Sequence, residues 1–123
     1  MPYRRISEYG VIGDMHSAAL VSGDGSIDWL CFPRFDSPSV FAALVDDAQG
    51  GYFRIRPVGE FQHDHSYLPE SNVLVANFQT RSGAVSLTDF MPVADEITHC
   101  EHEVVRVVRC QSGSVEMEAE FLP

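Results

Sequence analysis

The sequence has 123 residues, of which 45% are hydrophobic, and its 18 acidic and 8 basic side chains give a formal net charge of −10. This length suits one domain with a single core, and the hydrophobic content is typical of a folded protein. The negative charge repels phosphate groups, so we expect neither nucleic acid nor an anionic membrane surface as a partner.

Cysteine content and hydropathy indicate a cellular compartment. Three cysteines, Cys31, Cys100 and Cys110, cannot all pair within one chain, and no even-numbered disulfide framework is visible. The N-terminal residues lack the apolar stretch of a secretory signal, and the longest apolar run, residues 40–45, is far shorter than the ~20 residues that a membrane span needs. The sequence therefore predicts a cytoplasmic protein without a membrane segment.

The first predicted element is a β-hairpin. Residues 18–22 and 26–31 should pair as antiparallel strands around a Gly-Asp-Gly turn at 23–25, because glycine tolerates the positive φ angles of short turns. Strict alternation of side chains places Ile27 and Trp29 on the same face of the second strand.

A polar loop and one short helix should follow this hairpin. Pro33 ends the strand because it cannot donate a ladder hydrogen bond, and the Ser-Pro pair at 37–38 is typical of a helix start, which predicts a helix through residues 40–45. A loop held between two elements can display polar groups rigidly, which favours Arg34 and Asp36 as binding residues. A purely architectural hairpin and loop explains the same residues, and the pattern alone does not decide between these two interpretations.

The middle of the chain predicts one strand and one long loop. Residues 51–57 alternate, with Phe53 and Ile55 on the inward face of a half-exposed strand. Residues 58–69 read as a loop with His63-Asp64-His65 at its tip. A His-x-His pair can chelate zinc or copper, but no further ligand stands at ligand spacing, so we predict no metal site.

A second hairpin is predicted over residues 72–91, with Thr80 opposite Ala84 and with Gly83 in a left-handed conformation. Both faces of this hairpin, and both faces of the strand predicted at 103–110, are partly apolar. Antiparallel strands with one wet side alternate more cleanly, so we expect these strands to be covered on both faces.

The last predicted strand, residues 114–121, carries Glu116, Glu118 and Glu120 on one face, which we interpret as a solvated edge. At least six strands and one short helix make an all-β, antiparallel β-sandwich. Because the sequence ends on an apolar strand without a polar tail, we expect it to be a truncated piece of a larger architecture.

Seven motifs in a fixed order resemble a known family. They are Ile-Ser-Glu-Tyr-Gly-Val-Ile-Gly at 6–13, Ala-Ala-Leu-Val at 18–21, Gly-Ser-Ile-Asp-Trp-Leu-Cys at 25–31, Pro-Arg-Phe-Asp-Ser-Pro at 33–38, Gly-Gly at 50–51 before a Phe-x-Ile strand, Tyr-Leu-Pro at 67–69 and Thr-Asp-Phe-Met-Pro at 88–92. Together they resemble the N-terminal, trehalase-like β-sandwich domain of bacterial and archaeal family 15 glycoside hydrolases, the glucoamylase and trehalase group. The resemblance covers nearly the whole chain.

The resemblance implies one part of a two-part enzyme. In that family a large β supersandwich precedes an (α/α)6 helical domain, which carries the two carboxylates of an inverting hydrolysis of α-glucosides. No residue of this chain matches the catalytic acid or base of the family. The resemblance therefore implies that residues 1–123 are a truncated, non-catalytic N-terminal β-sandwich domain that supports a C-terminal catalytic domain of the same full-length chain and shapes its active-site mouth. We predict no cofactor and no metal for this domain.

Four residues are the predicted substrate contacts: Trp29, Arg34, Phe35 and Asp36. Arg34 and Asp36 can hydrogen-bond sugar hydroxyls, and the two aromatic rings offer an apolar face to a sugar ring. The alternative is a free-standing carbohydrate-binding or oligomerising module, which ranks second because most aromatic residues occupy core-like positions. A homo-oligomer is expected if an apolar face is left uncovered.

Overall fold

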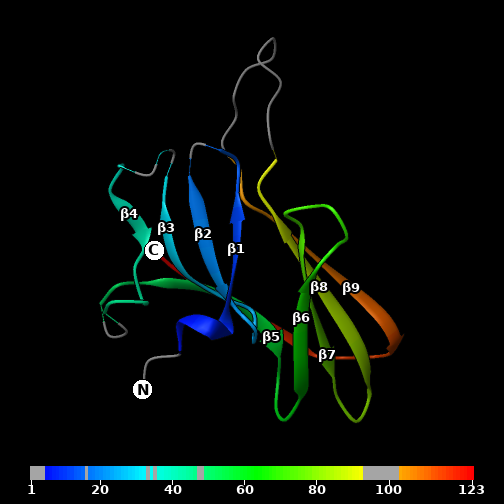
Figure 1. Cartoon of the computed structure of the whole chain (residues 1–123). Helices are drawn as coiled ribbons and strands as arrows, with labels where there is room; N and C mark the ends of the chain where they lie inside the picture. The colour runs from blue at the N-terminus through cyan, green and yellow to red at the C-terminus, as the bar shows by residue number, and fades with distance from the viewer. Residues whose placement is uncertain (1–4, 16, 33, 35, 47–48, 93–102) are drawn as a thin grey trace.

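The chain folds into two antiparallel β-sheets, seen in a computed structural model that describes residues 5–15, 17–32, 34, 36–46, 49–92 and 103–123 (Figure 1). The elements are the 3-10 turn η1 (Ile6–Glu8) and strands β1 (Tyr9–Gly13), β2 (Ala18–Ser22), β3 (Ser26–Cys31), β4 (Ser39–Phe41), β5 (Tyr52–Pro57), β6 (Gln62–Tyr67), β7 (Leu74–Gln79), β8 (Gly83–Phe90), β9 (Val105–Gly113) and β10 (Met117–Leu122). The predicted all-β antiparallel sandwich is confirmed.

Sheet A has the strand order β1-β2-β3-β5-β10, with the short strand β4 also paired to β3. Sheet B has the order β6-β7-β8-β9. The predicted first hairpin, β2 and β3, and the predicted strand at β5 are confirmed. Among the described residues no helix is long and apolar enough to cross a membrane.

The predicted short helix at residues 40–45 is wrong. Strand β4 occupies its first half, with Phe41 buried opposite Leu30 of β3. The main chain then bonds across the loop, because the N–H of Ala42 donates to the carbonyl of Gly50 at 2.7 Å and that of Leu44 to the carbonyl of Asp28 at 2.9 Å. A helix of six residues makes too few internal bonds to compete with this pairing to the sheet.

A β-bulge in β3 changes which face Trp29 occupies. Leu20 pairs with Trp29 while its neighbour Val21 pairs with Ile27, so Asp28 is the extra residue of β3. Ile27 is fully buried toward sheet B, whereas Trp29 is half-buried on the outer face of sheet A. The predicted common face of Ile27 and Trp29 is therefore wrong.

The register of the second hairpin differs by one residue from the predicted one. Gln79, not Thr80, pairs with Ala84. Thr80 instead closes a two-residue turn: its N–H donates to the carbonyl of Gly83 at 2.9 Å, and its hydroxyl accepts from the N–H of Gly83 at 3.2 Å. Gly83 is not left-handed; a Cβ there would collide with the main chain of Ser112 in β9.

Strand β7 has one wet side, because Leu74, Ala76 and Phe78 are buried while Asn77 and Gln79 on the opposite face are exposed. The expectation that this strand is covered on both faces is wrong. The long loop predicted at 58–69 is also wrong, since its second half forms β6 and pairs with β7.

The core consists of two clusters between the sheets. The first contains Ile12, Ala19, Val21, Ile27, Leu30, Phe41, Leu74 and Met91, and the second contains Ile55, Ala76, Phe78, Val85 and Leu87. The half-buried ring of Phe53 packs against both clusters. Burial of these side chains is the main stabilising contribution to the sandwich.

An ion pair lies inside the sandwich beside this core. Arg106 of β9 is 2% exposed and contacts Asp89 of β8, 1% exposed, with Nε–Oδ1 and Nη2–Oδ2 distances of 2.7 and 3.2 Å. The same guanidinium donates to the carbonyls of Phe53 and Gly25, both at 2.8 Å, and lies 4.9 Å from the centre of the Phe53 ring. One side chain of sheet B thus satisfies main-chain acceptors of sheet A and joins the two sheets.

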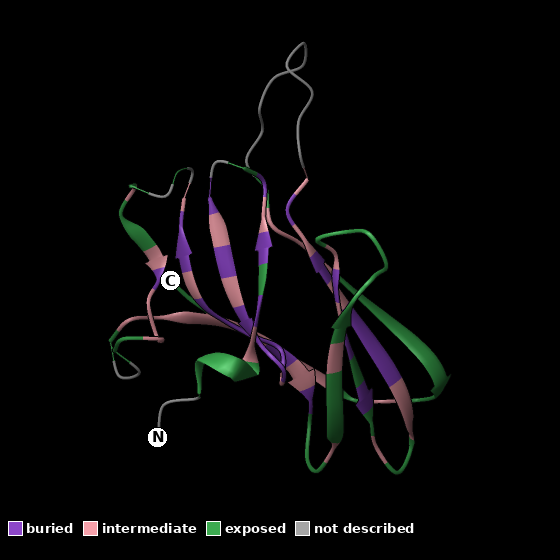
Figure 2. Ribbon diagram, in the orientation of Figure 1, coloured by how far each residue is buried: buried purple, intermediate pink, exposed green. Residues whose placement is uncertain are grey.

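The sandwich has two lateral sides that we name by their edge strands. The closed side is formed by β1 and β6: the hydroxyl of Tyr67 in β6 accepts from the N–H of Val11 at 2.7 Å and donates to its carbonyl at 3.1 Å. The open side is formed by β9 and β10. Figure 2 shows β9 exposed along most of its length, and Val108 remains 44% exposed although its partner Leu87 is fully buried.

Candidate functional site

The predicted binding loop forms a tight turn in the structure. The N–H of Arg34 donates to the hydroxyl of Ser37, and the N–H of Ser37 donates to the carbonyl of Arg34, both at 3.1 Å. Arg34 and Asp36 are exposed in this turn and form no ion pair with each other among the described contacts. Phe35 lies outside the described residues. The turn therefore presents one cation and one anion to solvent.

Trp29 lies on the strand that leads into this turn, beside a strongly anchored residue. The neighbouring Asp28 is buried and accepts hydrogen bonds from the hydroxyl of Tyr9, at 2.5 Å, and from the hydroxyl of Ser26. Its carbonyl holds Leu44 on the far side of the loop. Asp28 thus fixes both the strand before the predicted site and the segment after it, while Trp29 stays half-buried on the outer face.

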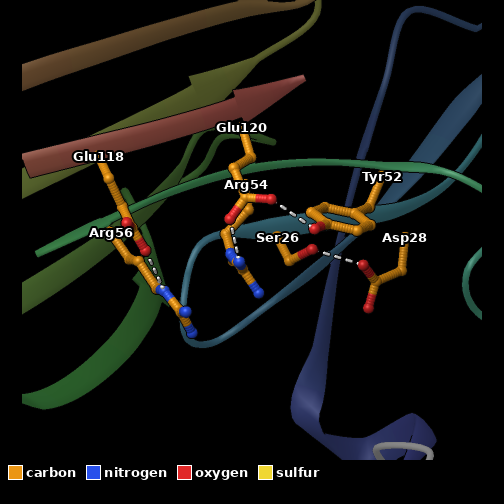
Figure 3. A network of polar contacts seen from close by, with 7 residues as sticks. All are labelled: Ser26, Asp28, Tyr52, Arg54, Arg56, Glu118 and Glu120. Carbon is orange, nitrogen blue, oxygen red and sulfur yellow. Dashed lines mark hydrogen bonds and ion pairs between the residues drawn. The ribbon is translucent and has the colours of Figure 1, made fainter. Parts of the chain in front are cut away.

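A charged ladder, which the sequence analysis did not identify, crosses the outer face of sheet A (Figure 3). Arg54 and Arg56 of β5 stand opposite Glu120 and Glu118 of β10. Arg56 Nε donates to Glu118 at 3.0 Å, and Arg54 also forms an ion pair with Glu120. Tyr52 donates its hydroxyl to Glu120 at 2.6 Å. Two members of the predicted acidic row, Glu118 and Glu120, are therefore paired with arginines, whereas Glu116 is exposed as predicted.

These contacts decide what the ladder can do chemically. The hydrogen bonds from Tyr52 and Arg54 hold the pKa of Glu120 below its ordinary value, and the bond to Glu120 raises the pKa of the Tyr52 phenol. A glycosidase acid needs the opposite, a raised carboxyl pKa, to carry a proton at neutral pH. Glu120 is therefore suited to holding β10 on β5 and unsuited to general acid catalysis.

Asp89 is also unsuited to contact with a substrate. Burial raises the pKa of its carboxyl, and the Arg106 guanidinium opposes that rise. Both partners lie inside the sandwich, where no ligand reaches them. This pair is a structural one.

The two histidines of β6 share one face of an extended strand, two residues apart. His63 is exposed and His65 is half-buried. Within the described residues no group of three or more His, Cys, Asp and Glu side chains could hold a metal ion. Of the cysteines that the structure describes, Cys31 is buried, Cys110 is exposed, and both are free thiols.

Comparison with known proteins shows which protein family the chain matches. The family model described as "Trehalase-like, N-terminal" matches residues 3–123. The trehalases of Mycolicibacterium smegmatis and Thermoplasma volcanium are 36% and 37% identical to this chain, over 94% and 98% of its length. Trehalase 1 of Sulfolobus acidocaldarius is 45% identical over 83% of the chain.

The matched regions are small parts of these relatives: 20% of each of the first two and 17% of the third. The chain thus spans about a fifth of the length of the curated relatives it matches. No solved structure matches the chain.

Proposed function

This chain belongs to the trehalase-like N-terminal family, and on that premise we propose that it is the non-catalytic β domain of a longer, cytoplasmic trehalase or glucoamylase. The observation that carries the proposal is the match of nearly the whole chain to about a fifth of several trehalases. The paired state of Glu118 and Glu120 also supports a non-catalytic role. Hydrolysis of an α-glucoside then belongs to a C-terminal helical domain of the same polypeptide.

The open side supports a docking role toward that domain. Val108 is 44% exposed and Phe121, on β10, is 60% exposed. The Phe121 ring packs edge-on against Phe41 and Phe53, which leaves its outer side free to meet another apolar surface. Exposed apolar side chains on edge strands are typical of surfaces that another part of a protein covers.

An unoccupied open side would also let two copies of the isolated chain associate. The proposal therefore includes a homo-oligomer of the 123-residue chain, to be measured by light scattering. The free-standing module predicted as the alternative shares this expectation. The two hypotheses differ in what they predict for the full-length protein. The first predicts that the proposed catalytic domain covers the open side and prevents the association, whereas the free-standing module has no such domain.

The proposed contribution to the active-site mouth comes from Trp29, Arg34, Phe35 and Asp36. The exposed, hydrogen-bonded turn of Arg34 and Asp36 supports this role, because preorganised polar groups bind sugar hydroxyls at a low entropic cost. The half-buried Trp29 lies on the strand that leads to that turn and follows the anchored Asp28 in the sequence.

Substitution in the full-length protein tests this role. Arg34→Ala and Asp36→Ala should each lower kcat/KM for trehalose and maltose about tenfold, because each removes charge-assisted hydrogen bonds to the substrate. Arg5→Ala, an exposed arginine far from the turn in sequence, is the control and should leave kcat/KM unchanged.

Two outcomes count against the proposal. If Arg34→Ala and Asp36→Ala proteins stay folded and keep wild-type kinetics, the substrate role of the turn is wrong. If the full-length protein hydrolyses neither glucoside, the assignment to a trehalase or glucoamylase is wrong.

A further inference from the structure

The outer face of sheet B gathers most of the amide side chains of the chain. The sequence holds four glutamines and two asparagines, and four of these six amides lie on this face: Gln62, Asn77, Gln79 and Gln111. The alternate residue Phe78 is buried, which confirms that its neighbours Asn77 and Gln79 point outward. All four amides are exposed. We name this set the amide face.

The amide face is held in place by the sheet. Gln62 stands directly opposite Gln79, and Asn77 donates from Nδ2 to Oδ1 of its opposite partner Asp64 at 3.1 Å. An amide has two N–H donors and two acceptor lone pairs, so Asn77 keeps its carbonyl oxygen and its second N–H available for a ligand.

A β-bulge brings Gln111 onto the same face. Val85 pairs with Cys110 while Ala84 pairs with Ser112, so Gln111 is the extra residue of β9. Its Nε2 donates to the buried hydroxyl of Ser86 at 3.0 Å. Bulges of this kind re-aim a side chain, and here the bulge directs a fourth amide over the sheet.

Two hollows meet on this face. One, of about 400 Å³, is lined by residues that include Asp64, Asn77 and Gln111. The other, of about 650 Å³, lies between the β5–β6 connection and the tip of the β7–β8 hairpin and is lined by Phe61 and Arg81 among others. Both are lined by Gln62 and Gln79, so the two hollows are adjacent, and we name them together the groove.

We propose that this groove binds an uncharged, polyhydroxylated chain, an oligosaccharide. Amide groups donate and accept at the same time, as sugar hydroxyls do, and Asp64 adds an acceptor. The overall charge of −10 disfavours phosphorylated or anionic ligands. Two adjacent hollows of about 650 and 400 Å³ suit several linked sugar rings rather than one. The choice of α-linked glucose as the sugar rests on the proposed function, whereas the proposal that the groove binds an oligosaccharide does not.

The test is calorimetric titration of the full-length protein with β-cyclodextrin, a ring of α-linked glucose units without a chain end. We expect saturable binding with a Kd on the order of 1 mM, as for a site of exposed hydrogen bonds. Asn77→Ala and Gln79→Ala should each raise the Kd about fivefold, the effect of one lost hydrogen bond. Gln49→Ala removes an exposed glutamine outside the groove and should leave the Kd unchanged.

The outcomes separate this inference from the proposed function. Absence of saturation, or a Kd that Asn77→Ala and Gln79→Ala leave unchanged, overturns the groove even if trehalose is hydrolysed normally. Binding that these two variants weaken supports the groove even if the protein hydrolyses no α-glucoside. Hydrolysis of trehalose, which does not use the groove, should be equal in wild type and in both variants.

Discussion

The edge strands on the closed and open sides of the sandwich differ in the polarity of their exposed side chains. On the closed side, Tyr67 bonds both main-chain groups of Val11, and the neighbouring edge strand β6 is polar along its exposed length. On the open side, β9 exposes Val108 and β10 exposes Phe121. Edge strands that face water need polar protection, and this difference between the two sides is the basis of the proposed docking role of the open side.

Arg106 is the link that fixes the open side to the rest of the molecule, and its loss should have the largest effect. Arg106→Ala leaves the carboxylate of Asp89 buried without its cation and removes the hydrogen bonds from Arg106 to the carbonyls of Phe53 and Gly25. We expect the free energy of unfolding to fall by about 3–5 kcal/mol, measured by urea denaturation. A loss below about 1 kcal/mol would show that β9 is held mainly by its pairing with β8.

Tyr67→Phe should have a smaller effect, confined to the closed side. The variant keeps the ring and removes two hydrogen bonds to Val11, which predicts a loss of about 1 kcal/mol in the free energy of unfolding. Hydrogen exchange at the Val11 amide should become faster while exchange in β9 stays the same. Equal acceleration in both strands would contradict the independence of the two sides.

Tyr52→Phe on β5 tests the ladder that holds β10, and its effect should be the smallest and depend on pH. The folded-state pKa of Glu120 is lowered, so the stability it contributes is fully present above the unfolded pKa of glutamate, ~4.3, and is lost as the pH falls through the folded value. The variant removes the hydrogen bond that contributes most to this lowering.

Thermal unfolding of wild type and Tyr52→Phe between pH 7 and pH 3 measures this effect. The two proteins should differ most at pH 7 and converge as the pH falls. A difference that stays constant over this range would mean that the contribution of the Tyr52 hydroxyl to stability does not depend on the charge of Glu120.

Local patterns in the sequence predicted the strands whose pairing is also local. The Gly-Asp-Gly turn identified the β2–β3 hairpin, and alternation identified β5. The apolar spacing around Val40 and Phe41 also fits a helix, and only the long-range pairing of β4 with β3 decides for a strand. The bulge at Asp28 likewise depends on partners on other strands.

For the same reason, only the part of the candidate site that depends on local signals could be predicted from the sequence. The exposed turn of Arg34 and Asp36 follows from local loop signals, whereas the ladder needs β5 and β10 side by side. Its signal was present as two rows of complementary charge at equal spacing, the arginines at 54 and 56 and the glutamates at 118 and 120. The Arg106–Asp89 pair had no such signal, because Arg106 stands among valines in an apolar strand.

The pairing of β5 with β10 has a consequence for synthesis. Arg56 and Glu118 are 62 residues apart in the sequence, so β10 is synthesised only after all four strands of sheet B. A growing polypeptide leaving the ribosome therefore carries an unfinished sheet A while sheet B can already form, and closure of this long loop is a slow step. Chaperone dependence during translation should be concentrated in the interval between the emergence of β5 and that of β10.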